Sequence, residues 1–226
     1  MIFSFKQYLR AFTLAEVLVT LGIIGVVSAM TVPTLMQNYQ RKSYVTQLHK
    51  VYNELQQAAQ QYMTDRNAVN LREAGLTSND ALANFVKTYF KVINDCGEDR
   101  QPCMSDDYKK ITGKVLGNAS GQPLNMTIAS GVSFGFGISS TGTANNNRVA
   151  IFDVDINGSQ GPNIAGRDVF ILGLFNNGIV DEYQLTTAPG DKDTREEIFN
   201  NYCIADNTSW VGCFGKILND NWEMTY

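Results

Sequence analysis

Side chains able to bind a cation lie in the segment Asp153-Val154-Asp155-Ile156-Asn157-Gly158, where oxygen-bearing residues alternate with apolar ones before a glycine. Calcium prefers carboxylate and amide oxygens, and this alternation resembles the first half of a helix-loop-helix calcium loop. The second half does not match, because such a loop ends in a bidentate glutamate and this chain has Ile164 at that place. We therefore predict a calcium site at a strand end, formed by Asp153, Asp155, Asn157 and Asp168, with Asn163 nearby in the chain.

An alternative reading of this segment needs no metal. The chain continues through Asn157-Gly158 and Gly161-Pro162, which are turn-forming pairs. Aspartate side chains in such turns often accept hydrogen bonds from nearby backbone N–H groups. Both interpretations stay open at this point.

A second chemically notable residue is Glu16, which stands alone in an apolar segment. A short leader with Lys6 and Arg10 precedes Phe12, and after Glu16 no charged residue occurs up to Gln40. About 20 apolar residues suffice for a helix to cross a membrane. A charge inside such a span costs on the order of 2.5 to 3.5 kcal/mol and is retained mainly where it has a partner or a function. The sequence therefore predicts a partner for Glu16.

Four cysteines, Cys96, Cys103, Cys203 and Cys213, all follow the apolar segment. If the basic leader stays in the cytoplasm, they lie on the other side of the membrane, where an even number of cysteines favours disulfides. Three pairings are possible. We favour Cys96 with Cys103 and Cys203 with Cys213, because closing a short loop costs the least entropy. The spacings do not fit the short cysteine knuckles of structural zinc sites.

The segment from Ala11 to Pro33, AFTLAEVLVTLGIIGVVSAMTVP, resembles the N-terminal motif of type IV prepilins and type II secretion pseudopilins. The resemblance rests on Phe12, Thr13, Leu14 and Glu16, on the apolar stretch that follows, and on Pro33. It implies that a prepilin peptidase cleaves between Ala11 and Phe12 and methylates the new amino group of Phe12. Ala11 departs from the usual glycine of the family, and Ala15 from a larger aliphatic residue.

The same resemblance implies how the chain assembles and where it resides. Glu16 of an incoming subunit is expected to pair with the Phe12 amine of a neighbour, with other pilin or pseudopilin subunits and inner-membrane assembly machinery as partners. The expected location is the cytoplasmic membrane, with the C-terminal part outside the cytoplasm and later in a periplasmic or extracellular filament. Pseudopilins also carry a calcium-stabilised loop in their C-terminal half, which agrees with the calcium prediction.

These residues must be positioned by a small number of elements. We expect a leader at 1–11, a membrane-spanning helix half at 12–36, an amphipathic half at 37–64 and a globular domain at 65–226. Pro33, with Gly22 and Gly25 before it, should bend or locally melt the helix, because proline removes a backbone hydrogen bond. His49 falls off the apolar stripe, so we expect it on the solvent side. The stripe recurs every three or four residues at Val45, Leu48, Tyr52, Leu55, Ala59 and Tyr62.

The remaining sequence predicts an α+β domain of pilin-like order, with the long helix packed on an antiparallel sheet. Ser78 looks like the cap of a second helix, a third short helix is expected at 194–204, and the aromatic tail should dock on the domain. Asn177-Gly178 predicts a hairpin in which both turn residues have positive φ. Strands are expected at Thr127–Ile138, Arg148–Ile156, Asp168–Phe175 and Ile179–Leu185.

Composition narrows the function class. A net charge of -4 gives no basic face for nucleic acid. The chain carries no nucleophile-elbow, zinc-helix or phosphate-loop motif, so we expect no enzyme. Two hypotheses stay open: a structural subunit of a type IV pilus or type II secretion pseudopilus, and a monomeric, signal-anchored surface domain that binds or adheres.

Overall fold

The computed structural model describes residues 13–117, 121–139 and 146–226. It divides after Arg41 into two compact units, Met1–Arg41 and Lys42–Tyr226. One helix, α1 (Leu14–Asp65), contributes to both units and runs through Pro33 without an interruption. Its end at Asp65 lies one residue from the predicted end at 64.

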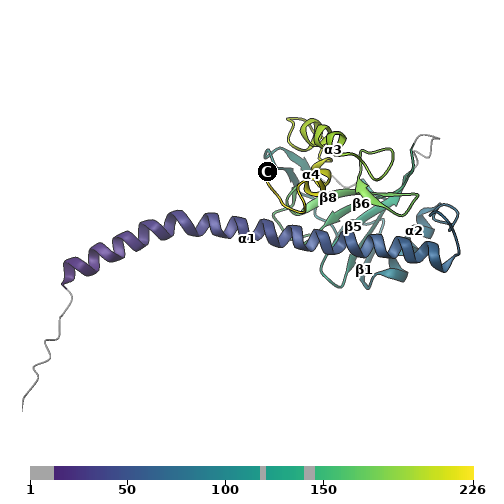
Figure 1. Ribbon diagram of the computed structural model, residues 1–226. Helices are drawn as coiled ribbons and strands as arrows, with labels where there is room; N and C mark the ends of the chain where they lie inside the picture. The colour runs from purple at the N-terminus through teal and green to yellow at the C-terminus, as the bar shows by residue number, and fades with distance from the viewer. Residues whose placement is uncertain (1–12, 118–120, 140–145) are drawn as a thin grey trace, which may run out of the picture. The chain divides into compact units, whose positions relative to one another are not determined.

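In the second unit, α1 lies across a mixed β-sheet (Figure 1). The predicted stripe is confirmed: Val45, Leu48, Leu55, Ala59 and Tyr62 are buried in the main core, and Tyr52 is half-buried against it. Burial of one helix face against a sheet is the arrangement that an amphipathic pattern favours. The fold class predicted from the sequence, a long N-terminal helix packed on a sheet in an α+β domain, is confirmed.

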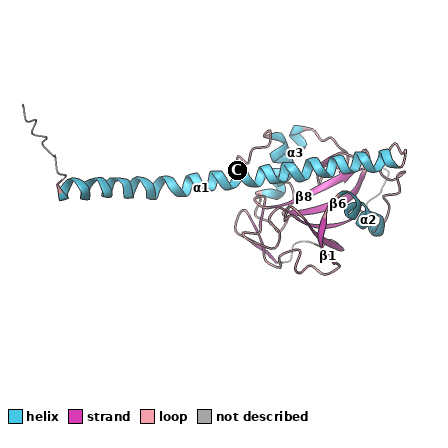
Figure 2. Ribbon diagram, turned by 90° about the horizontal axis from the view of Figure 1, so that it is seen from below, coloured by secondary structure: helices cyan, strands magenta, loops and turns pink. Residues whose placement is uncertain are grey.

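The sheet is built, in the described residues, from nine strands in the order β1-β4-β5-β6-β8-β7-β2-β3, with β9 paired to β8. Their bounds are β1 Val92–Gly97, β2 Tyr108–Lys110, β3 Val115–Gly117, β4 Leu124–Ile128, β5 Ser133–Ile138, β6 Arg148–Asp155, β7 Ile164–Ala165, β8 Val169–Phe175 and β9 Val180–Glu182. Figure 2 shows the central strands and α2 from a second direction. The sheet is not wholly antiparallel, because β7 pairs in parallel with both β2 and β8.

Two strand predictions need correction. The predicted strand Thr127–Ile138 is two strands, since the chain turns between β4 and β5 with Gly131 at φ 87°. In the hairpin that joins β8 to β9, Gly178 has φ 80°, but Asn177 is not among the described residues with positive φ. The side chain of Asn177 instead donates to the carbonyl oxygen of Ala188. The turn at Asn177-Gly178 therefore differs from the predicted one, and the Asn177 side chain contacts a distant loop.

Three further helices cover the sheet and its ends: α2 (Asn79–Tyr89), α3 (Lys192–Ile198) and α4 (Cys213–Asn219). The Ser78 cap is confirmed, because its hydroxyl accepts the N–H of Ala81 at 3.2 Å. A one-turn π-helix, η1 (Phe199–Cys203), follows α3 directly. The third predicted helix is therefore present, as an α-helix that continues into a π-helical turn. The aromatic tail is docked, with Phe214 and Ile217 fully buried.

Candidate functional site

The start of α1 brings Thr13 and Glu16 into a reciprocal cap. The backbone N–H and the hydroxyl of Thr13 donate to the Glu16 carboxylate at 2.9 and 3.0 Å, and the Glu16 N–H donates to the Thr13 hydroxyl at 3.2 Å. This is a capping box, in which the two residues satisfy each other's polar groups at a helix N-terminus. Ala11 and Phe12, the predicted cleavage and methylation residues, lie outside the described residues.

The helix surface on both sides of Glu16 is apolar and exposed. Leu14, Leu18 and Met30 are 77%, 61% and 73% exposed, and no residue from Thr13 to Gln40 is buried. By length and composition, α1 is the one helix in the described part of the chain that is able to cross a membrane. A long apolar helix at the N-terminus, joined to a sheet domain, is thus a candidate membrane anchor.

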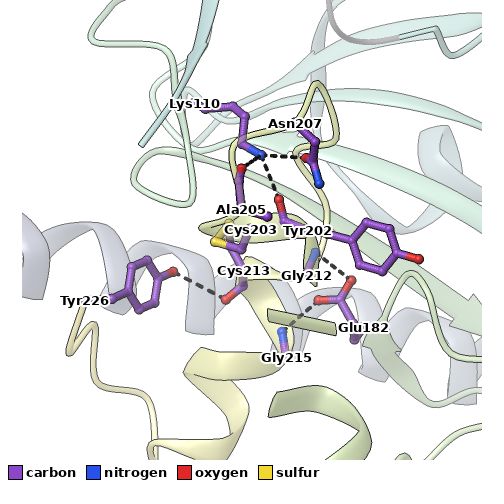
Figure 3. Close-up of a disulfide and its surroundings, with 10 residues drawn as sticks. All are labelled: Lys110, Glu182, Tyr202, Cys203, Ala205, Asn207, Gly212, Cys213, Gly215 and Tyr226. Atoms are coloured by element: carbon purple, nitrogen blue, oxygen red, sulfur yellow. Dashed lines mark hydrogen bonds between the residues drawn. A yellow bond between two sulfur atoms is a disulfide. The ribbon is translucent and has the colours of Figure 1, made fainter. Parts of the chain in front are cut away.

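Both predicted disulfides are present. Cys96 is bonded to Cys103 and Cys203 to Cys213, and all four cysteines of the chain are used. The second disulfide closes the loop between η1 and α4, and Tyr226 donates to the carbonyl oxygen of Cys213 at 3.3 Å (Figure 3). The C-terminal residue therefore contacts the base of this loop.

A buried lysine holds the same loop from the side of β2. Lys110 is 1% exposed, and its ammonium donates to the carbonyl oxygens of Tyr202 and Ala205, both at 2.8 Å, and to Oδ1 of Asn207 at 2.9 Å (Figure 3). Burial lowers the pKa of Lys110. All three N–H bonds of the ammonium are satisfied by uncharged oxygens, so the lysine crosslinks β2 to the loop without forming an ion pair.

A buried glutamate holds the other end of the loop. Glu182 at the end of β9 is fully buried, and its two carboxylate oxygens accept the N–H groups of Gly212 and Gly215 at 3.0 and 2.8 Å (Figure 3). Burial raises the pKa of Glu182 to about 7, although the backbone N–H groups act in the opposite direction. A carboxylate accepting N–H groups at the first turn of α4 occupies the place that helix N-termini favour for negative charge.

Sequence reasoning had singled out neither Lys110 nor Glu182. Glu182 falls two residues after Val180 in β9, so strand alternation places it on the same face as a buried valine, and this is the signal that could have predicted a buried, hydrogen-bonded group. Lys110 follows Lys109, and alternation along a short strand gives no indication which of the two points inward.

Of the predicted calcium ligands, Asp155 and Asp168 lie in one buried polar network. The hydroxyl of Tyr108 donates to Asp155 at 2.8 Å, and Asp168 accepts the N–H groups of Asn163 and Ile164 at 2.8 and 2.6 Å. Burial raises the pKa of both carboxyls, that of Asp155 to about 8, and their mutual repulsion adds to the shift of Asp155. Asp153 lies two residues earlier in β6 and is 1% exposed.

The oxygens of this network fit calcium in kind. Oδ1 of Asn157 and Oδ1 of Asn163 are buried without a hydrogen-bond partner, and amide oxygens are ordinary calcium ligands. The turn interpretation also has support, because the side-chain amide of Asn157 donates to the carbonyls of Gln160 and Gly161. Within the described ranges, no group of three or more acidic, histidine or cysteine side chains is placed to hold a metal. Calcium binding therefore stays a prediction.

The prediction for His49 was wrong. Its ring stacks on Trp222 with centroids 3.9 Å apart and an interplanar angle of 16°, and Trp222 also contacts Tyr52 and Phe214. The docked tail covers this side of α1, which the helix periodicity alone did not reveal. His49 thus belongs to the contact between the tail and the helix.

The chain was compared with known proteins. No family model, no curated protein and no solved structure matches it. Two features carry chemical meaning: an apolar helix that starts with a capped glutamate, and a domain closed by disulfides and buried polar crosslinks.

Proposed function

We propose that this chain is the structural subunit of a filament of the type IV pilus or type II secretion pseudopilus kind. The observation that carries the proposal is the exposed apolar half of α1, in which Glu16 is the single charged residue between Thr13 and Gln40. Such a surface is stable only in lipid or against other apolar helices. A subunit that moves from the membrane into a filament of packed helices meets both environments in turn.

Glu16 supplies the specific contact in this proposal. Cleavage after Ala11 would create an amino group at Phe12, and a cation and an anion in a low-dielectric helix bundle attract each other far more strongly than in water. The capping box with Thr13 holds the carboxylate beside the helix start, next to Phe12 in the chain. We expect the Glu16 carboxylate of one subunit to pair with the Phe12 amine of a neighbour and thereby set the axial register.

Several partners follow from the same proposal. A prepilin peptidase would process the leader, inner-membrane assembly machinery would extract the subunit, and other pilin or pseudopilin subunits would surround it. The two disulfides support a domain outside the cytoplasm, because disulfides persist in oxidising compartments. The chain would thus reside in the cytoplasmic membrane before it enters a periplasmic or extracellular filament.

The proposal is tested by the terminus and by one substitution. Mass spectrometry of the mature protein from its host should show N-methylated Phe12. Glu16→Ala should insert, be processed and form both disulfides, yet enter the sheared filament fraction at least tenfold less than the parent chain. Glu98→Ala, which removes an exposed carboxylate from the domain, is the matched control and should assemble normally.

Two results would contradict this picture at different points. An intact Met1 terminus throughout the membrane pool, with no protein in a filament fraction, would favour the monomeric anchored domain. Normal incorporation of Glu16→Ala would be compatible with the filament proposal but would rule out the proposed charge pair.

A further inference from the structure

Residues 220–226 follow α4 and lie against both α1 and the second disulfide loop; we call this segment the C-terminal strap. Near its start, the ring of Trp222 stacks on His49 of α1, with ring centroids 3.9 Å apart. At its end, the hydroxyl of Tyr226 donates to the carbonyl oxygen of Cys213 (Figure 3). The strap thus connects α1 to the disulfide at the start of α4.

The strap begins with an ordinary helix end. Asn221 has φ 56°, and the N–H of Trp222 donates to the carbonyl oxygen of Ile217 at 2.9 Å. A left-handed residue followed by this hydrogen bond is a Schellman motif, and asparagine is one of the residues that take the left-handed position. The positive φ of Asn221 therefore needs no further explanation.

The backbone of Trp222 is the unusual feature. Its φ is 63°, so it is a second successive residue in the left-handed region, where a bulky side chain is rarely found because its Cβ crowds the backbone. Strained conformations persist where surrounding contacts hold them, and they occur in clamps and switch segments. Besides His49, the Trp222 ring contacts Tyr52 and Phe214, at centroid distances of 5.0 and 6.2 Å. These ring contacts hold a backbone that is strained.

The two ends of α1 within the second unit are held in different ways. At the distal end, Tyr62 packs edge-on against Phe85 of α2 at 5.3 Å, and the hydroxyl of Tyr89 donates to Asp65 at 2.6 Å. These contacts come from regular helices. At the proximal end, the side of α1 that carries His49 is covered by the strap. Segments held by few contacts open at a lower free energy than the whole domain.

We propose that the C-terminal strap is a releasable latch on α1. When it is closed, it holds residues 45–52 in the domain. When it opens, these residues separate from the domain while the distal part of α1 stays packed. Opening relieves the strain at Trp222, which offsets part of the ring contacts that are lost. Val45 and Leu48, which are buried, become exposed with the segment, so the open state is the minor one.

The latch would change how much of α1 the domain holds. Freeing residues 45–52 lengthens the part of the helix outside the domain by about 12 Å, at a rise of about 1.5 Å per residue. The domain would then turn on the contacts that remain around Tyr62. This inference goes beyond the proposed function and does not depend on it, because the latch operates within one chain.

Hydrogen exchange measures the opening directly. Full-length chain in detergent micelles is exchanged under native conditions and analysed by mass spectrometry of α1 peptides. We expect residues 45–52 to exchange faster than residues 55–63. Trp222→Ala should accelerate exchange in 45–52 by about tenfold, because aromatic contacts are lost, and leave 55–63 unchanged. Glu223→Ala is the matched control, since Glu223 is exposed in the same strap, and it should change neither segment.

A glycine substitution separates strain from ring contacts. Trp222→Gly and Trp222→Ala both remove the ring, but glycine takes positive φ about as readily as negative φ, whereas alanine does not. Residues 45–52 should therefore exchange about threefold more slowly in the glycine variant than in the alanine variant. Faster exchange in the glycine variant would contradict strain at this position.

Two results would overturn the latch. In the first, residues 45–52 and 55–63 of the parent chain exchange at one rate and respond equally to urea, so that α1 separates only when the whole domain unfolds. In the second, Trp222→Ala accelerates exchange throughout the domain. If Trp222→Ala does not form both disulfides, Trp222→Phe, which keeps a smaller ring, gives the same comparison with a smaller change.

Discussion

Two single residues, Lys110 and Glu182, join distant parts of the chain at the second disulfide loop. Each replaces water around a buried ion with hydrogen bonds from or to the backbone, and this is the condition under which a charged group is tolerated in a core. Removing one member of such a set leaves its partners unsatisfied, which costs more than the hydrogen bonds themselves contribute. The loop should therefore be sensitive to single substitutions at these two positions.

Lys110→Met should destabilise the domain by about 2 to 3 kcal/mol, because it removes the three hydrogen bonds of a buried ammonium, although the Ala205 carbonyl oxygen and Oδ1 of Asn207 each keep a backbone N–H donor. The neighbouring Lys109→Met is the matched control, since Lys109 is exposed in the same strand and should change stability by less than about 0.5 kcal/mol. Urea unfolding of the two variants, with both disulfides intact, measures the difference. Equal midpoints would show that the Lys110 contacts contribute little.

Glu182 should make stability depend on pH. Its pKa is raised to about 7 in the folded domain, so the folded state holds the proton more tightly than the unfolded chain. The contribution of Glu182 to the free energy of unfolding is then highest at acid pH and falls as pH rises from about 4.3, the ordinary glutamate value, to about 7, by roughly 3 to 4 kcal/mol in total. Thermal midpoints between pH 4.5 and 8 should fall less steeply in Glu182→Gln. An unchanged slope would exclude Glu182 as the source.

Calcium binding is tested by adding and removing the metal. If Asp155, Asp168 and the free amide oxygens bind calcium, saturating calcium should raise the thermal midpoint over that in chelator, since a ligand that binds only the folded state stabilises it. At a concentration of about 100 times the dissociation constant the gain is about 2.7 kcal/mol. Asp168→Asn should reduce the gain. Identical midpoints in calcium and chelator would leave the turn interpretation.

At the scale of elements, patterns with a period were predicted well and contacts between distant segments were not. The α1 stripe, the Ser78 cap and the hairpin at Gly178 follow from local spacing and turn chemistry, and each was found. Strands β1, β2, β3 and β7 were not predicted. Of these, β2, β3 and β7 are only two or three residues long, and β2 and β7 pair with each other from distant parts of the chain. His49 was misplaced for the same reason, since the tail that covers it comes from the other end of the sequence.

The disulfides could be predicted from the sequence, whereas the surroundings of the predicted calcium ligands could not. Pairing of Cys96 with Cys103 was predictable because a short loop limits the choice. The environment of Asp155 was not, because the hydroxyl that donates to it belongs to Tyr108 of β2, 47 residues earlier in the chain.

The packing of α1 on the sheet gives a direct element-level prediction. Leu55→Ala should destabilise the domain by about 2 to 5 kcal/mol, because Leu55 is fully buried and the truncation leaves a cavity under the helix. Gln57→Ala, on the exposed face two residues away, should change stability by less than about 0.5 kcal/mol. Urea unfolding of the pair measures both values. A loss for Gln57→Ala as large as that for Leu55→Ala would mean that its face is not free in the monomer.

At the scale of the whole molecule, the sheet is completed by segments that lie far apart in the sequence. Strand β2 pairs with β7, which requires the chain up to Ala165, and its Lys110 requires oxygens from Tyr202, Ala205 and Asn207, which requires the chain up to Asn207. Contacts between segments distant in sequence form late, since the chain entropy lost in joining them is large. A chain held in the membrane by its N-terminal helix while the rest is exported would therefore remain incomplete at this edge until its last residues arrive. If the chain is exported in this way, export and completion of the domain are coupled, and a truncation after Cys203 would damage β2, about 90 residues before the cut.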